Sequence, residues 1–147
     1  AELYTKFEKR GYTMTLLELI YNKPELIIQE ATNALMRVQL PHYSKFRLEE
    51  IQKKYSNLLL ALTKCIETQS CHDMIGYMDL ISDERFASGF EVEEIQIALN
   101  IFEEALWKNI RKYVDPQVHY ASKKMVTTII DKAKEELLNE YVTLSKS

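Results

Sequence analysis

The three histidines, His42, His72 and His119, are the first candidates for metal, haem or proton-transfer chemistry. No two of them share a helix face at the spacing that an HExxH zinc site requires. Cys65 and Cys71 add two soft donors close to His72, but zinc takes four closely arranged ligands and no fourth cysteine or histidine is near in the sequence. The sequence therefore predicts no metal site and ordinary surface or core roles for these side chains.

Two other histidine chemistries are considered. The His72–Ile75 segment has the histidine and acidic residue that open a histidine-kinase phosphoacceptor helix, but Tyr77 and Met78 occupy the region where that motif has its proline. Haem is compatible with a chain of globin size, yet it needs a proximal histidine that faces a large apolar pocket. His72 and His119 both fall at expected helix starts, where exposure is the default, so a haem-binding gas sensor is kept only as an alternative.

Carboxylate pairs and glycine-rich motifs also fail to predict catalysis. The pairs Glu93-Glu94, Glu103-Glu104 and Glu135-Glu136 are adjacent in sequence, so they splay around a helix and are expected to be solvated. The three glycines lie too far apart for a phosphate loop, a dinucleotide fingerprint or a serine elbow. We predict no catalytic residues, no cofactor and no enzymatic activity.

The composition is that of one helical domain spanning residues 1–147. Hydrophobic residues make up 46% of the 147 residues, enough for a core, and only three glycines and three prolines interrupt the pattern. Apolar residues recur at three- and four-residue spacing almost throughout, so we predict an all-α bundle of five or six helices. The net charge of −3 argues against direct nucleic-acid binding, and the longest apolar run, residues 58–62, is too short to cross a membrane.

Caps and breakers place the expected helices. Thr13 or Thr15 caps a first short helix, Pro24 opens a second, and the segment 40–44 ends it. The further helices are expected over residues 45–68, over 71–88 with Gly89 as the C-terminal glycine, from about Glu91, and from Asp115-Pro116 to the C-terminus.

The last expected helix carries an apolar stripe that suits a helix–helix seam. Its residues are Val126, Ile130, Ala133, Leu137, Tyr141 and Leu144. We predict that this long helix dimerises the chain and couples it to a downstream domain, and that it extends past a compact body beyond Leu137. The alternative is that part of the stripe, widened by Ile129 and Leu138, packs on the domain's own core.

Two features bear on context. With two cysteines and no CxxC motif, we expect a reduced, cytoplasmic protein. Ala1 stands where a full chain would start with methionine, so we expect a domain of a longer protein.

The segment from Arg85 to Trp107 is the part of the chain that points to a family. A helix that bears an arginine ends at a glycine, followed by a hydrophobic residue, acidic residues and a second helix that reaches a tryptophan. The residues that carry this pattern are Arg85, Gly89, Phe90, Glu93, Glu94, Ile95, Ala98 and Trp107. The segment resembles the N-terminal domain of RsbR-type stressosome co-antagonist proteins, the RsbRD N-terminal family.

The resemblance covers about a quarter of the chain. It implies a sensory or regulatory input domain of a bacterial signalling protein, with a globin-like fold that holds no haem. No catalytic residues carry over, because the matched positions are packing and turn residues. A small-ligand pocket like that of regulator effector domains is a second alternative, and the sequence does not name the signal.

Overall fold

The computed structural model describes residues 14–147, and these fold into an all-α bundle, as predicted. Met14 and Val114 form an isolated backbone bridge, the one strand-like pairing in the described part. The α-helices, with two short 3₁₀ helices between them, are α2 (Leu16–Asn22), α3 (Pro24–Val38), η1 (Tyr43–Lys45), α4 (Leu48–Thr68), α5 (His72–Ala87), α6 (Val92–Tyr113), η2 (Pro116–Val118) and α7 (His119–Ser145).

The helix ends follow local chemistry that the sequence displays. Thr15 caps α2: its hydroxyl accepts from the Glu18 N–H at 3.2 Å, and the Glu18 carboxylate accepts from the Thr15 N–H at 3.0 Å. Pro24 stands at the start of α3, as expected. Thr13, the other cap candidate, lies outside the described residues. Two helices end without glycine, since Gln39 and Gln69 adopt the left-handed conformation at their C-caps.

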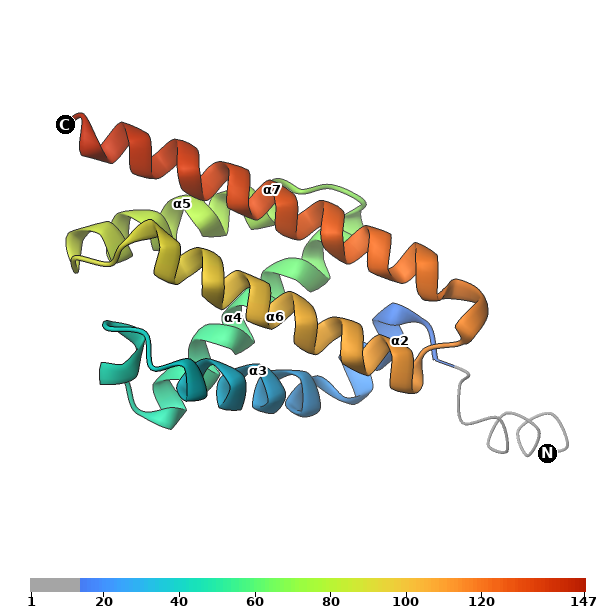
Figure 1. The fold of residues 1–147 in the computed structure, drawn as a ribbon. Helices are drawn as coiled ribbons and strands as arrows, with labels where there is room; N and C mark the ends of the chain where they lie inside the picture. The colour runs from blue at the N-terminus through green and yellow to red at the C-terminus, as the bar shows by residue number, and fades with distance from the viewer. Residues whose placement is uncertain (1–13) are drawn as a thin grey trace, which may run out of the picture.

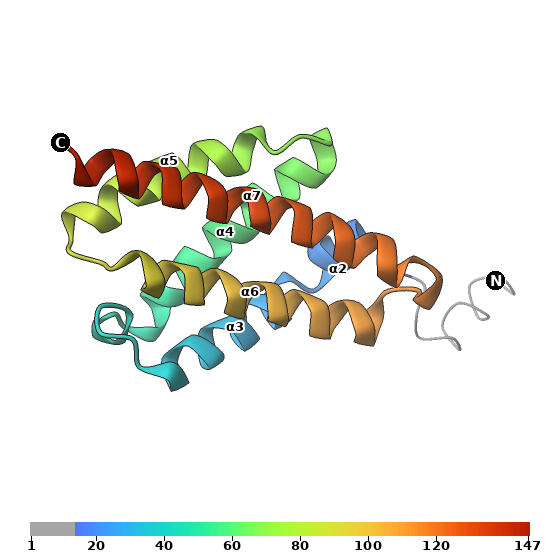
Figure 2. The ribbon, with the colours of Figure 1, turned by 45° about the horizontal axis from the view of Figure 1, so that its top comes forward.

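α7 packs against both α5 and α6, α6 also packs against α3, and α4 crosses behind them (Figure 1). The turned view shows α4 running diagonally between α3 and α5 (Figure 2). The α6–η2–α7 segment is an antiparallel hairpin, and the C-terminus of α7 lies at the same end of the bundle as the α5–α6 turn. This arrangement places residues near 90 and residues near 141 next to each other.

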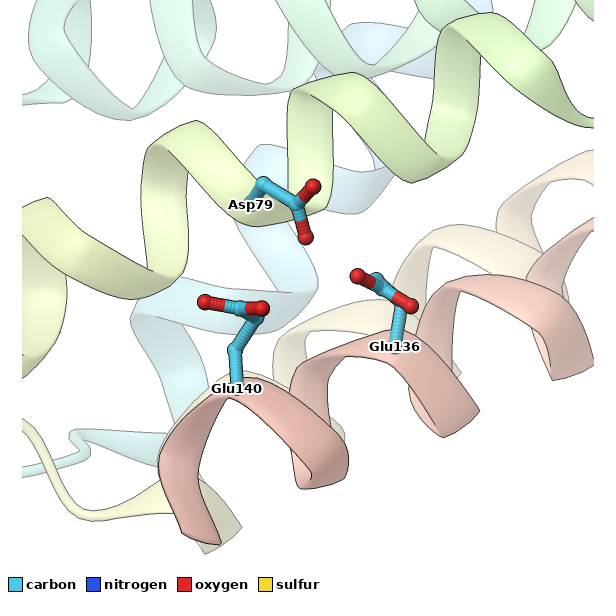
Figure 3. A group of neighbouring side chains, drawn as sticks. All are labelled: Asp79, Glu136 and Glu140. Carbon is cyan, nitrogen blue, oxygen red and sulfur yellow. The ribbon is translucent and has the colours of Figure 1, made fainter. Parts of the chain in front are cut away.

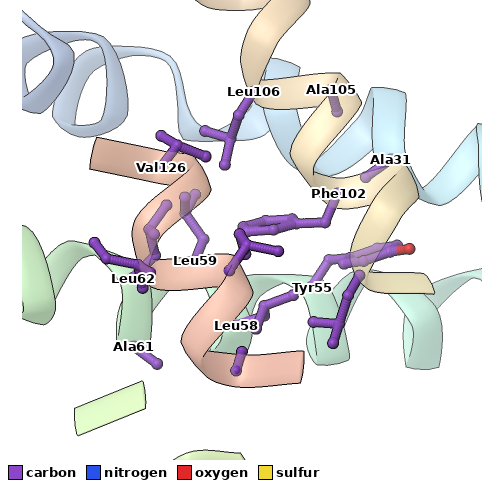
Figure 4. Close-up of a cluster of buried hydrophobic side chains, with 14 of the residues drawn as sticks. Ala31, Tyr55, Leu58, Leu59, Ala61, Leu62, Phe102, Ala105, Leu106 and Val126 are labelled. Carbon is purple, nitrogen blue, oxygen red and sulfur yellow. The ribbon is translucent and has the colours of Figure 1, made fainter. Parts of the chain in front are cut away.

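The core fills the space between α4 and the layer in front of it (Figure 4). Phe102 of α6 is fully buried and its ring stacks on Tyr55 of α4, with 5.7 Å between the ring centroids. The Tyr55 hydroxyl donates to the backbone oxygen of Ala98 at 2.8 Å, so the polar tip of a buried ring is satisfied. α4 and α6 are thereby fixed to each other at mid-length.

The start of the last helix differs from the prediction. Asp115 accepts a hydrogen bond from the Gln117 N–H at 3.0 Å and Pro116 follows it, but together they open the short helix η2. The α-helix itself starts at His119 and runs for 27 residues, about 40 Å at 1.5 Å per residue. The long C-terminal helix is confirmed, and only its first turn was misassigned.

The predicted stripe of α7 faces the interior of its own chain. Val126, Ile130, Ala133 and Leu137 are completely buried, Tyr141 is 9% exposed and Leu144 is half-buried. α7 packs against both α5 and α6, and these two helices cover the stripe. The interpretation that the stripe outruns the compact body beyond Leu137 is therefore wrong, because α5 and α6 extend as far as Tyr141.

Substitution by alanine is expected to have opposite effects on stability at Gly89 and Gly76. Gly89 has a φ of +86°, a conformation that costs an L-residue about 1–2 kcal/mol, whereas Gly76 is helical with nothing within 4 Å of an added Cβ. We expect Gly89→Ala to destabilise the fold by about 1 kcal/mol and Gly76→Ala to stabilise it by up to about 1 kcal/mol. Denaturant unfolding of the two variants measures both effects, and equal signs would contradict the assignment of Gly89 as the α5 terminator.

Candidate functional site

The site is built around Arg85, in the last turn of α5. The side chain is only 5% exposed although it carries a permanent charge. After it, Gly89 reverses the chain with its positive φ, and the Phe90 N–H donates back to the Arg85 carbonyl oxygen at 3.0 Å. The Gly89 turn predicted from the sequence is confirmed, and it folds Phe90 back over the arginine.

Aromatic rings surround the Arg85 guanidinium. Its central carbon lies 5.9 Å from the centroid of the Tyr43 ring and 5.8 Å from that of Phe90, close enough for a cation–π contribution. The Phe90 ring also meets Tyr43 edge-on at 5.0 Å and stacks on His42 at 4.8 Å. We call Tyr43, Phe46 and Phe90 the aromatic wall. It joins the loop around η1 to the α5–α6 turn.

Glu94 holds this loop in place. Its carboxylate accepts the backbone N–H of His42 at 2.8 Å and that of Glu91 at 3.1 Å, and it pairs with His42 Nδ1 at 2.7 Å. Glu94 is 4% exposed, so the prediction that the Glu93-Glu94 pair is solvated is wrong for Glu94. Glu103 is also buried, at 7%, because α6 turns that side of the helix toward α7.

The hydrogen bonds around Glu94 also set its acidity. Burial acts to raise the pKa, but the backbone N–H groups of His42 and Glu91 and the His42 side chain outweigh it, so the pKa of Glu94 lies below its ordinary value of 4.5. The carboxylate is therefore an anion at neutral pH. It accepts from these donors and forms no ion pair with Arg85.

A cavity of about 30 Å³ lies beside Arg85, between α3, α4, α5 and α6. Its walls are mainly aliphatic, with Tyr43, Tyr55 and Tyr77 as the aromatic members. Lys54 and Arg85 are its charged members, and no carboxylate of residues 14–147 lines it. The Nε and Nη1 atoms of Arg85 are buried and have no hydrogen-bond partner among the described residues. The cavity is thus apolar, small and positively charged.

Burial shifts the other titratable groups that line this cavity. It raises the pKa of Tyr43, against the opposing effect of the Arg85 charge. Burial and the nearby Arg85 charge both lower the pKa of Lys54. Lys54 Nζ lies 4.3 Å from the centroid of the Phe46 ring. Two positive charges therefore face the same cavity, and the carboxylates of Glu84 and Glu50 partly offset the lowering of the Lys54 pKa.

The aromatic wall is joined to the end of α7. The Tyr141 hydroxyl donates to the Phe90 carbonyl oxygen at 2.9 Å, a hydrogen bond between buried groups. The Tyr141 ring also packs edge-on against Phe86, with 5.4 Å between centroids. The α5–α6 turn beside Arg85 is therefore in direct contact with the last turns of α7, so a movement of the turn would act on them.

None of the three histidines lines the cavity. His42 is engaged by Glu94, His119 bonds through Nε2 to the Val114 carbonyl oxygen at 2.6 Å, and His72 is exposed at the start of α5. Cys65 is buried and Cys71 is half-buried near the α4–α5 connection, and neither forms a disulfide. These five residues share no site.

A second cluster lies on the far side of α5. Carboxylate oxygens of Asp79 on α5 and of Glu136 and Glu140 on α7 lie within 4.8 Å of one another (Figure 3). Among residues 14–147 this is the group whose geometry could ligate a metal ion. The pKa of Glu136 is raised to about 7. Hydrogen bonding to Asp79 is the largest cause, and burial and the neighbouring carboxylate charges add to it. A shared proton thus relieves the repulsion at neutral pH.

This cluster predicts a pH dependence of stability. Since the folded pKa of Glu136 is raised from 4.5 to about 7, the contribution of this group to stability is fully present below 4.5 and is lost as the pH rises through 7. We expect Glu136→Gln to remove this loss and to stabilise the protein at pH 8 by about 1–2 kcal/mol, after a reduction for solvent screening. Urea unfolding at pH 5 and pH 8 measures it, with the exposed neighbour in Glu135→Gln as the control. Equal pH profiles for wild type and Glu136→Gln would rule out the shared proton.

The structure brings most of the family-pattern residues together. Arg85, Ile95 and Ala98 line the cavity, and Gly89 and Phe90 form the turn that closes it. Trp107 lies farther along α6, half-buried, and is not a lining residue. The residues that sequence reasoning missed are Tyr43, Lys54 and Tyr77 around Arg85, and the Asp79 cluster. The i,i+4 spacing of Glu136 and Glu140 was the one available signal for the latter.

Comparison of the chain with known protein families, with curated proteins and with solved structures gives no match. Across residues 14–147, every helix is either too short or too polar to span a lipid bilayer.

Proposed function

We propose that this domain is a non-enzymatic signal-input domain of a bacterial signalling protein, and that it couples through α7 to an output domain. The observation that carries the proposal is the contact path from Arg85 to the end of α7. Arg85 lies against Phe90, and the Phe90 carbonyl oxygen accepts the Tyr141 hydroxyl. A ligand in the cavity would act on the same turn that holds the last turns of α7.

The resemblance of the 85–107 segment to RsbR-type input domains supports the same proposal. In that family the segment has packing and turn roles, and here its residues surround a cavity instead of a catalytic group. A globin-like topology and a cytoplasmic location are part of this proposal.

Self-association is the second part of the proposal, and it uses a different surface of α7 from the stripe predicted from the sequence. Because the predicted stripe is buried, α7 offers Leu138 and Val142 instead, which are 43% and 53% exposed and lie one turn apart. We propose that these two residues form the apolar centre of a homodimer contact along α7. Leu138→Glu with Val142→Glu is expected to shift sedimentation toward monomer, and unchanged sedimentation would remove this surface from the proposal.

The small-ligand alternative becomes part of the proposal, while the haem alternative gains no support. A haem needs an axial ligand in an apolar pocket, and no histidine lines the cavity beside Arg85.

Ligand-observed NMR against a panel of small metabolites tests the input function. We expect at least one compound to bind saturably and to be recovered unchanged. Turnover of a bound compound would make the protein an enzyme. A Soret band in protein purified from haem-replete cells would make it a haem sensor.

A further inference from the structure

The Arg85 guanidinium is the strongest unexplained feature of the molecule. Only 5% of the surface of Arg85 is exposed to solvent. Two of its nitrogens, Nε and Nη1, donate to nothing in the described chain. Buried arginines in proteins are normally paired, because an unpaired buried charge carries a large desolvation cost. Cation–π contacts with Tyr43 and Phe90 recover part of that cost and leave Nε and Nη1 without an acceptor.

The acidic residues nearest to Arg85 are committed elsewhere or exposed. Glu94 is taken by His42 and Glu91, and Glu84 is exposed to solvent. Arg85 belongs to none of the ion pairs formed within residues 14–147. The cavity that it lines adds a second cation, Lys54, and within the described part of the chain no carboxylate. Among residues 14–147, no carboxylate is therefore paired with Arg85.

From these observations we infer that the cavity binds the carboxylate group of a short-chain monocarboxylic acid, with Arg85 as its principal ligand. This inference rests on the proposed input function, because it names the ligand that the domain would sense. Guanidinium N–H groups match the planar carboxylate in both charge and geometry. Lys54 adds a second positive charge at the same cavity.

Size and polarity select this acid class over other anions. The volume of about 30 Å³ holds roughly two water molecules, the size of a carboxylate group and much less than an aromatic ring. The aliphatic walls, which include Leu35, Ile51 and Leu99, would have to shift outward to receive a short alkyl chain, which limits its length. A phosphate dianion would need more donors than this cavity offers and would lose its hydration against apolar walls.

Isothermal titration with sodium propionate at constant ionic strength tests the inference. Sodium chloride and the neutral isostere propionamide serve as ligand controls, and acetate and butyrate extend the series. We expect saturable binding of propionate only to proteins that keep Arg85. Arg85→Met should weaken it at least about tenfold, since a charge-assisted hydrogen-bond pair is lost. Arg85→Lys keeps the positive charge without the forked guanidinium, so its affinity for propionate should lie between those of wild type and Arg85→Met.

Arg85→Met is expected to fold, because it preserves the apolar stem and removes an unpaired buried charge, and its melting temperature without ligand should equal or exceed that of wild type. The Arg85 side-chain Nε–H resonance of wild type gives a second readout and should shift with propionate and not with propionamide. Equal responses to chloride or propionamide, or binding that survives in Arg85→Met, would overturn the inference.

The two proposals can fail separately. If carboxylates do not bind while another metabolite from the panel binds in an Arg85-dependent way, the ligand class is wrong and the input function stands. If propionate binds in the cavity and α7 does not respond, the ligand class stands and the input function fails.

Discussion

Leu137→Glu is expected to destabilise the domain by about 4 kcal/mol or more, since it places a carboxylate in a fully buried apolar position. Leu137 is 0% exposed, in the part of α7 that α5 and α6 cover. An ionised glutamate would have no partner there, and a protonated one would still leave polar atoms unsatisfied. Urea unfolding followed by circular dichroism gives the free energy of unfolding.

The adjacent Leu138→Glu is the matched control. Leu138 is 43% exposed, so at protein concentrations where the proposed α7 dimer is dissociated its substitution should change stability by no more than about 0.5 kcal/mol. The stripe's interpretation as a free dimer seam required Leu137→Glu to leave helicity mostly intact. Similar stabilities for the two variants would restore that interpretation and contradict the packing of α7 described above.

Glu94→Ala is expected to cost about 2–3 kcal/mol, because it removes the acceptor for two backbone N–H groups and the partner of His42 Nδ1. Glu94→Gln keeps one acceptor oxygen without the charge and should lose about half as much. The neighbouring exposed residue provides the control: Glu93→Ala should lie within about 0.5 kcal/mol of wild type.

The pH dependence of the Glu94 effect follows from its depressed pKa. The stabilisation is fully present above the unfolded value of 4.5 and is lost as the pH falls through the folded pKa. The stability difference between wild type and Glu94→Gln should therefore shrink below pH 4.5. A difference that is constant down to the acid transition would show that the charge of Glu94 contributes nothing.

Local signals in the sequence were sufficient for the helices. Thr15, Pro24 and Gly89 each act through their own backbone neighbourhood, so their roles could be predicted without a three-dimensional model. Asp115 and Pro116 acted locally as well, but the turn they open is a 3₁₀ helix whose hydrogen bonds differ by one residue from the expected α-helix.

The site could not be predicted because its contacts are long-range. Glu94 is buried by His42, which lies 52 positions earlier in the chain, and no periodicity reports such a pair. Arg85 was expected to be a packing residue of the family pattern, and its burial without a partner appears only when α4, α5 and α6 are assembled. Periodicity correctly predicted that the apolar stripe of α7 is a packing face. It does not say whether the surface that covers this face belongs to the same chain.

The central claim is that the Arg85 cavity is coupled to the end of α7 through Phe90 and Tyr141. Hydrogen exchange of the backbone amides at residues 141–145 tests it most directly, compared in wild type, Arg85→Met, Tyr141→Phe and the double variant. The account predicts that Arg85→Met changes exchange in these last turns, and that the change disappears when Tyr141→Phe is already present. Identical exchange of residues 141–145 in wild type and Arg85→Met would contradict the coupling.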